Sequence, residues 1–249
     1  MCVMILTNNV ILITGGTSGL GREMAKRFIG LGNRVIVCSR NPEKLEETKK
    51  LLPNIEAYRC DISDGAARIQ LYHWIMENFP KLNVLINNAA IVHKADFLAD
   101  ETSYEKAVAE INTNLLATIH LSKLFLGHLS KQPNASLINI TTGLVYIPRA
   151  IYPFYNATKS AVHAFTQTLR RQLLNHPVKI IEVLFPAVDT PWHGGTPPKI
   201  AISPEQAVDE MFTGLGKGHT EIKVAGVKLL YLLSRFLPKL AFRKMNSLT

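Results

Sequence analysis

The hydrophobic residues of this chain fall into short, strongly apolar runs that alternate with longer stretches of mixed polarity. Runs of this length, rich in β-branched residues and without alternation, are typical of strands that are covered on both faces. Six such runs predict strands: VILIT at 10–14, RVIVCS at 34–39, IEAYRC at 55–60, NVLINN at 83–88, SLINIT at 136–141 and KIIEVLF at 179–185.

The stretches between these runs have helical spacing. Leu20, Met24 and Phe28 recur at every fourth residue and would share one helical face, and Pro42 suits the first position of a second helix. Strands that alternate with helices are joined by crossovers and therefore pair in parallel. We expect one α/β domain over residues 1–249, a doubly wound, Rossmann-type parallel sheet flanked by helices, with ligands at the carboxyl ends of the strands.

A glycine-rich segment, TGGTSGLG at 14–21, links the first strand to the first helix. Glycines allow a tight turn and let a phosphate approach the backbone N–H groups at the positive end of a helix. The spacing of Gly15, Gly19 and Gly21 differs from the usual GxGxxG fingerprint of dinucleotide sites. By itself the segment is also compatible with an ordinary strand-to-helix turn.

Tyr155 and Lys159 are four residues apart and would stand on one face of a helix. A cation beside a phenol stabilises the phenolate and moves the phenol pKa toward neutrality, which suits a general acid/base. Thr141 ends a predicted strand and Thr142 follows it, and alternation along a strand points their side chains in opposite directions. A hydroxyl beside the phenol could stabilise an oxyanion. The alternative is a surface Tyr and Lys on an amphipathic helix.

The order and spacing of these motifs resemble the short-chain dehydrogenase/reductase family over almost the whole chain. The C-terminal half is most similar to the DltE-type branch, named for the oxidoreductase of the D-alanine-transfer operon. The pieces that carry the resemblance are TGGTSGLG at 14–21, Asp61, NNAA at 87–90, Asn114, TTG at 141–143, YNATK at 155–159, PAVDT at 186–190 and KLLYLLSRFLPKLAFRKMN at 228–246.

The resemblance implies hydride transfer between a nicotinamide cofactor and a small-molecule carbonyl or secondary alcohol. It implies four catalytic residues: Asn114, Thr142, Tyr155 and Lys159. Lys159 would also hold the nicotinamide ribose, and Asn114 would orient a water that relays protons to it. Cofactor contacts are expected, besides Tyr155 and Lys159, from Gly15, Thr17, Ser18, Gly19, Leu20, Gly21, Ser39, Arg40, Asp61, Ile62, Asn88, Ala89, Pro186, Val188 and Thr190.

Three positions depart from the family pattern. Thr142 stands where Ser is usual, and Ala90 and Ala187 stand where Gly is usual. An added methyl where the backbone must approach a cofactor, or where φ is positive, would be unfavourable. These departures leave open an NADP(H)-binding sensor or regulatory protein with a degenerate active site.

The cofactor preference is predicted from the residues after the second strand. An NAD enzyme places an acidic residue there to bind the ribose hydroxyls, whereas this chain has Ser39 and Arg40. A guanidinium can bind a 2′-phosphate that a carboxylate would repel, so we predict NADP(H) in preference to NAD(H). The alternative is that Arg40 only covers the surface.

We expect two loops to contact the substrate and two long helical stretches to contact another subunit. Two loops, at about 143–154 and 187–202, are expected to form an apolar substrate pocket. The stretches 103–130 and 153–175 have long helical patterns, and the equivalent helices of the resembling family pair across a two-fold axis. A homodimer or homotetramer is therefore expected.

The chain carries 28 Lys and Arg against 19 Asp and Glu, a net charge of +9, which suits nucleic acid, an anionic membrane or an anionic ligand. No basic recognition pattern accompanies the charge, so no nucleic-acid role is expected. The basic, apolar segment 226–249 has two interpretations. It packs beside the substrate pocket or a partner subunit, or it makes a weak contact with an anionic membrane surface.

Cys2, Cys38 and Cys60 lack CxxC spacing, and the eight His residues lack ligand spacing, so we expect neither disulfides nor a metal site. Reduced thiols, no signal-like N-terminus and no apolar run of 18 residues suggest a cytoplasmic protein.

Overall fold

The computed structural model describes residues 3–191 and 196–247. Its centre is a seven-stranded sheet in the order β3-β2-β1-β4-β5-β6-β7, and every neighbouring pair of strands is parallel. The strands are β1 (Val10–Thr14), β2 (Arg34–Ser39), β3 (Ile55–Arg59), β4 (Val84–Asn87), β5 (Ser136–Thr142), β6 (Lys179–Phe185) and β7 (Glu221–Lys223).

The six strands predicted from the apolar runs are all present, with ends that differ by at most one residue. The short edge strand β7 was missed because its sequence, EIK, has a single apolar residue between two charged ones. The helices on either side of the sheet are α1 (Gly19–Gly30), α2 (Pro42–Leu51), α3 (Gly65–Asn78), α4 (Ser103–Glu110), α5 (Ala117–Leu129), α6 (Pro153–Gln172), α7 (Pro204–Gly216), α8 (Val227–Phe236) and α9 (Pro238–Asn246).

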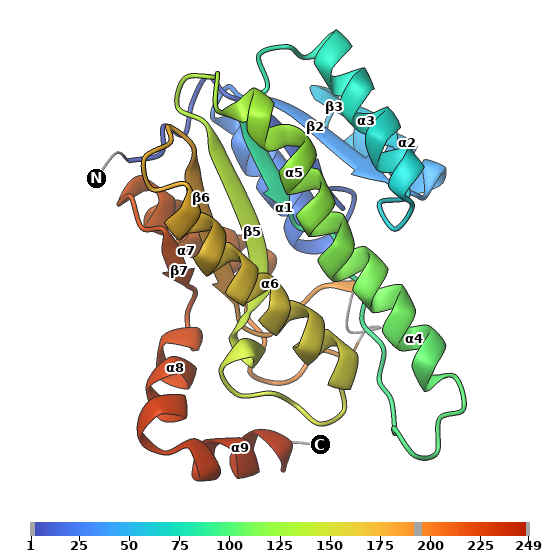
Figure 1. Cartoon of the computed structure of the whole chain (residues 1–249), viewed down its shortest axis with the longest axis vertical. Helices are drawn as coiled ribbons and strands as arrows, with labels where there is room; N and C mark the ends of the chain where they lie inside the picture. The colour runs from blue at the N-terminus through green and yellow to red at the C-terminus, as the bar shows by residue number, and fades with distance from the viewer. Residues whose placement is uncertain (1–2, 192–195, 248–249) are drawn as a thin grey trace.

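Helices cover both faces of the sheet, as the doubly wound prediction requires (Figure 1). Along β1, Ile11 and Ile13 enter the core shared with α1, α2 and α7, whereas Leu12 enters the core shared with α3, α5 and α6. This alternation explains the continuous apolar runs, because central strands such as β4 and β5 bury both of their faces. The first core includes a contact between Phe28 and Phe212, whose ring centroids are 4.6 Å apart.

The strand order places a crevice above β1. This strand pairs with β2 on one side and with β4 on the other, so the chain reverses its direction of travel across the sheet there. Loops leaving the carboxyl ends of β1 and β4 then separate, which is where open α/β sheets bind ligands.

The long helical pattern at 103–130 is not one regular α-helix. A π-helical segment (Ile111–Leu116) separates α4 from α5, and it contains Asn114. Such π segments occur frequently at functional sites. The pattern at 153–175 forms a regular helix, α6, that ends at Gln172.

The last two helices stand apart from the sheet at one end of the molecule (Figure 1). Gly143, directly after β5, packs against Val227 and Leu230 of α8. Asn246 at the end of α9 accepts a hydrogen bond from the N–H of Ala150 (2.6 Å) and donates one to the carbonyl oxygen of Pro148 (3.1 Å). The segment therefore packs against the residues that follow β5, and its packing beside a substrate pocket or a partner subunit stays a prediction. None of the described helices combines the length and apolarity needed to cross a membrane.

Candidate active site

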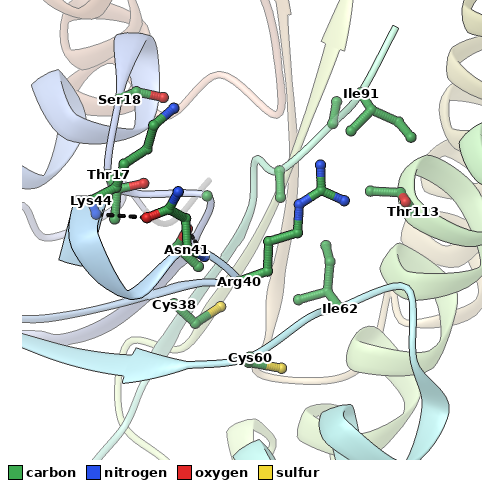
Figure 2. Close-up of a pocket in the computed structure, with 14 residues that line it drawn as sticks. Thr17, Ser18, Cys38, Arg40, Asn41, Lys44, Cys60, Ile62, Ile91 and Thr113 are labelled. Atoms are coloured by element: carbon green, nitrogen blue, oxygen red, sulfur yellow. Dashed lines mark hydrogen bonds between the residues drawn. The ribbon is translucent and has the colours of Figure 1, made fainter.

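A cavity of about 330 Å³ opens at the carboxyl ends of β1, β2 and β4 (Figure 2). Seven of the predicted cofactor residues line it: Gly15, Thr17, Ser18, Ser39, Arg40, Ile62 and Ala89. Seven residues that were not predicted to contact the cofactor line it as well: Cys38, Asn41, Lys44, Cys60, Ala90, Ile91 and Thr113.

The glycine-rich turn is packed so closely that side chains would not fit. Gly15 has φ +65°, and a Cβ there would lie 2.9 Å from the Cα of Ala89. A Cβ on Gly21 would lie 2.2 Å from the carbonyl oxygen of Gly15. Asn88 donates to the carbonyl oxygens of Thr14 (2.9 Å) and Gly15 (3.2 Å), which fixes the turn from the side of β4.

The N-terminus of α1 is available to an anion. The helix begins at Gly19, and its N-cap, Ser18, makes no side-chain hydrogen bond to the first turn. The unpaired N–H groups and the positive end of the helix dipole therefore lie beside the cavity that Ser18 lines. This arrangement fits a pyrophosphate, as the glycine spacing suggests.

Two cations reach the cavity from the segment after β2. Figure 2 shows the side chain of Arg40 extending toward Ile91 and Thr113, and that of Lys44 extending toward Ser18. Lys44 is placed by the start of α2, where its N–H donates to the side chain of the N-cap, Asn41 (2.8 Å). The sequence signal for Lys44 was its position in the first turn after Asn41-Pro42.

The other predicted cofactor residues do not line the cavity. Asp61 accepts hydrogen bonds from the N–H (3.0 Å) and hydroxyl (2.8 Å) of Ser63. Thr190 lies against Gly19, since a Cβ on this glycine would be 3.0 Å from the Thr190 methyl. Besides Tyr155 and Lys159, the predicted cofactor residues that do not line the cavity are Gly19, Leu20, Gly21, Asp61, Asn88, Pro186, Val188 and Thr190. Residues 192–195 of the predicted substrate loop, like Cys2, lie outside the described residues.

Tyr155 and Lys159 share one face of α6, as their spacing predicts. The Nζ atom of Lys159 lies 5.9 Å from the centroid of the Tyr155 ring and donates to the carbonyl oxygen of Ile140 in β5 (2.8 Å). Lys159 is 3% exposed, and this burial lowers its pKa to about 8, while the carboxylates of Glu182 and Glu110 act in the opposite direction.

The pKa of Tyr155 is shifted opposite to the predicted direction. Burial raises the pKa of the phenol, and the nearby carboxylate of Glu110 raises it further. Loss of solvent and a negative neighbour therefore outweigh the cation that the spacing places nearby. A phenol with a raised pKa is protonated at neutral pH and is a weaker proton donor than an exposed tyrosine.

The two threonines at the end of β5 have different partners, as alternation along a strand predicts. The Thr141 hydroxyl donates to a carboxylate oxygen of Glu182 (2.6 Å). The Thr142 hydroxyl oxygen accepts from the N–H of Leu144 (3.3 Å). That bond uses only an acceptor position of Thr142, so its hydroxyl proton is left for another oxygen.

Asn114 holds the loop after β4. Its side-chain oxygen accepts from the N–H of Ile91 (2.9 Å), and its side-chain nitrogen donates to the carbonyl oxygen of Ile91 (2.9 Å). The same nitrogen lies 3.2 Å from the hydroxyl of Thr158, next to Lys159. Asn114 thereby joins the loop, the π-helical segment and α6, while its part in a proton relay stays a prediction.

Two fully buried carboxylates near Lys159 were missed by the sequence analysis. Glu110 accepts from the N–H (2.7 Å) and the ring Nδ1 (3.0 Å) of His93. Glu182 in β6 is paired with His163 of α6. A single acidic residue inside the otherwise apolar strand KIIEVLF was the available signal for Glu182.

The doubt raised by Ala90 and Ala187 loses weight in the structure. Within the described residues, the non-glycine residues with positive φ are Asn8, Asn134 and Ala225, so neither Ala90 nor Ala187 requires a glycine conformation.

The thiols of Cys38 and Cys60 are free and buried, and burial raises the pKa of Cys60 to about 11, so neither is a reactive thiolate. No metal-binding group of three His, Cys, Asp or Glu residues occurs in the described part of the chain.

Comparisons with known proteins agree with this geometry. A family model described as short chain dehydrogenase matches residues 9–200. The uncharacterized oxidoreductase DltE of Bacillus subtilis (strain 168) is 42% identical over 98% of this chain and 99% of its own length.

Solved structures share the fold at lower identity. A short chain dehydrogenase from Burkholderia cenocepacia J2315 in complex with NADP has a TM-score of 0.85 at 23% identity, covering 97% of this chain and 99% of the other. A short chain dehydrogenase/reductase from Burkholderia phymatum in complex with NAD has a TM-score of 0.84 at 19% identity, covering 100% and 98%.

Proposed function

The chain belongs to the short-chain dehydrogenase family, as an oxidoreductase of the DltE type, and we propose that it is an NADPH-dependent reductase of small aldehydes or ketones. The observation that carries the proposal is the pairing of a buried Lys159 with Tyr155 on α6, where Lys159 also donates to Ile140 of β5, the strand that ends at Thr142. A donor, a cation and a second hydroxyl are the groups that carbonyl reduction needs.

The glycine-rich turn and the N-terminus of α1 would hold the pyrophosphate, and Arg40 and Lys44 would bind the 2′-phosphate. When bound, the reduced nicotinamide supplies a hydride to the carbonyl carbon. Solved neighbours contain NADP or NAD, so the fold alone does not choose between the two cofactors. The preference for NADP(H) rests on the two cations in the cavity and on the lack of an acid at Ser39 and Arg40.

Tyr155 would donate its phenolic proton to the carbonyl oxygen as the hydride reaches the carbon, giving the alcohol. Thr142 would donate a hydrogen bond to the same oxygen and stabilise the charge that develops there. Lys159 would stabilise the tyrosinate that remains and attract its replacement proton. The raised pKa of Tyr155 makes the phenol by itself a weaker acid, so the proposed proton donation depends on Lys159 stabilising the tyrosinate.

The proposal is tested by comparing binding with turnover. NADPH binding is measured by fluorescence, and NADPH oxidation is followed with a panel of aldehydes and ketones. We expect turnover with part of the panel and its loss in Tyr155→Phe, with NADPH binding retained. Tight binding with equal background oxidation in the wild type and Tyr155→Phe would instead favour a cofactor sensor.

A further inference from the structure

Helices α8 and α9 expose an unusual amount of apolar surface for the end of a globular chain. Phe236 is 78% exposed, Leu240 60% and Leu229 59%. The full set of exposed large apolar side chains on these helices and the residue between them is Leu229, Leu232, Phe236, Leu237, Leu240 and Phe242. We call these residues, with the cations named next, the terminal surface.

The terminal surface is also strongly basic. Its exposed cations are Lys228, Arg235, Lys239, Arg243 and Lys244. The sequence contains no acidic residue after Glu221, and none of the five cations forms an ion pair within residues 3–191 and 196–247. A partner must therefore cover apolar side chains and supply negative charge at the same time.

These helices have a fixed orientation on the molecule. Val227 and Leu230 of α8 pack on Gly143, and Asn246 of α9 holds the loop at Pro148 and Ala150. The terminal surface is thus attached to the segment that follows Thr142 and leads to Tyr155, at the end of the molecule shown in Figure 1. A partner bound there would lie next to the loop predicted to contact substrate.

A second copy of the chain is a poor match for this surface. A two-fold contact pairs a surface with itself, so five cations would face five identical cations without an acid between them. Nucleic acid offers phosphates for the cations but no apolar layer that would cover leucine and phenylalanine side chains. The surface of a lipid bilayer with anionic headgroups offers both.

We propose that the terminal surface binds the surface of an anionic lipid bilayer, with its leucine and phenylalanine side chains inserted between the headgroups and its lysine and arginine side chains at the lipid phosphates. The contact is peripheral. It is independent of the oxidoreductase proposal and does not require cofactor or substrate.

The test is co-sedimentation of the full-length chain with vesicles. Vesicles of equal parts phosphatidylcholine and phosphatidylglycerol should pellet the protein at least about tenfold more strongly than phosphatidylcholine alone, because each basic residue contributes about 1 kcal/mol at an anionic surface. Added salt should weaken the binding. Equal binding to both vesicle types, or to neither, would overturn the proposal.

Two double variants separate the contributions of charge and apolar contact. Lys228→Glu with Arg235→Glu, and Phe236→Ser with Leu240→Ser, should each reduce vesicle binding at least about tenfold. Matched controls are Lys131→Glu and Leu98→Ser, since Lys131 is exposed and Leu98 is 97% exposed, both outside α8 and α9. Retained vesicle binding in both double variants would contradict the proposal.

The competing occupants give distinct results. If Phe236→Ser with Leu240→Ser halves the mass by light scattering, the terminal surface is a subunit contact and the proposal fails. If DNA retains the wild type but not the charge variant, and vesicles retain neither, the surface binds phosphates without lipid and the proposal also fails. Unchanged thermal unfolding of each variant would show that the fold is retained.

Discussion

The Nδ1 atom of His163 lies 2.8 and 2.9 Å from the two carboxylate oxygens of Glu182, inside the interface between α6 and β6. The hydrogen bond with Glu182 raises the pKa of His163 despite its partial burial. Thr141 donates to the same carboxylate, and Glu182 also raises the pKa of Lys159 electrostatically. A buried carboxylate therefore connects the end of β5 with α6.

The first prediction concerns the pH dependence of reduction. Lys159 is charged below its pKa of about 8 and loses its charge as pH rises through that value. In the proposed mechanism the cation stabilises the tyrosinate formed on proton donation, so kcat/KM should fall above about pH 8. Glu182→Gln removes a negative charge that favours the ammonium, so the fall should occur at lower pH.

Thr141→Val is the matched control for Glu182→Gln. It removes the hydrogen bond of 2.6 Å to Glu182 but leaves the negative charge in place. The midpoint of its pH profile should stay with that of the wild type. A profile that is the same in Glu182→Gln and the wild type would show that Glu182 only packs and does not influence Lys159.

The strands and the four-residue separation of Tyr155 and Lys159 were predictable because both are local features of the sequence. An apolar run such as 10–14 reports burial on both faces, and a separation of four residues places Tyr155 and Lys159 on one helical face whatever the surroundings. The Gly15, Gly19 and Gly21 pattern is local in the same sense, since two of the three glycines have positive φ and the third packs against Gly15.

The electrostatics of the site were not predictable in this way. The pKa of Tyr155 depends on burial and on Glu110, 45 residues earlier in the sequence, so the spacing to Lys159 gave the wrong direction. Glu182 lies in a different strand from the motif it influences. The π-helical turn at Asn114 was also hidden, because the apolar pattern of α4 and α5 continues through it.

The second prediction concerns the cofactor. Arg40→Ala should raise the Michaelis constant for NADPH more than that for NADH, because only NADPH carries the 2′-phosphate that the guanidinium would bind. Lys44→Ala should act in the same direction, since Lys44 lines the same cavity. Each substitution is expected to raise the Michaelis constant for NADPH about tenfold, which is the typical effect of losing a charge-assisted hydrogen bond. Lys50→Ala, an exposed cation of α2 outside the cavity lining, is the control. An unchanged NADPH to NADH ratio in both cavity variants would refute the assignment.

The third prediction concerns assembly. Tyr104 is 76% exposed, and the apolar side chains of Val108, Ile111 and Leu116 are exposed along the same helical stretch. We propose that this stretch, with α6, forms an isologous subunit contact, so light scattering should give a multiple of 27.7 kDa. Ile111→Glu would place a carboxylate on each side of the proposed apolar contact and should reduce the mass to 27.7 kDa. Leu229→Glu on α8 should leave the mass unchanged, and a monomeric wild type at micromolar concentration would contradict the contact.

The last prediction concerns the hydroxyl at the end of β5. Thr142→Val keeps the shape of the side chain and removes the proton that we assign to the carbonyl oxygen, so turnover should fall on the order of a hundredfold, the usual cost of one oxyanion donor. Thr142→Ser keeps the donor and should retain most of the activity. The valine variant also loses the acceptor for the Leu144 N–H, so thermal unfolding must be compared. If Thr142→Val turns over like the wild type while Tyr155→Phe is inactive, Thr142 only packs, and another group stabilises the oxyanion.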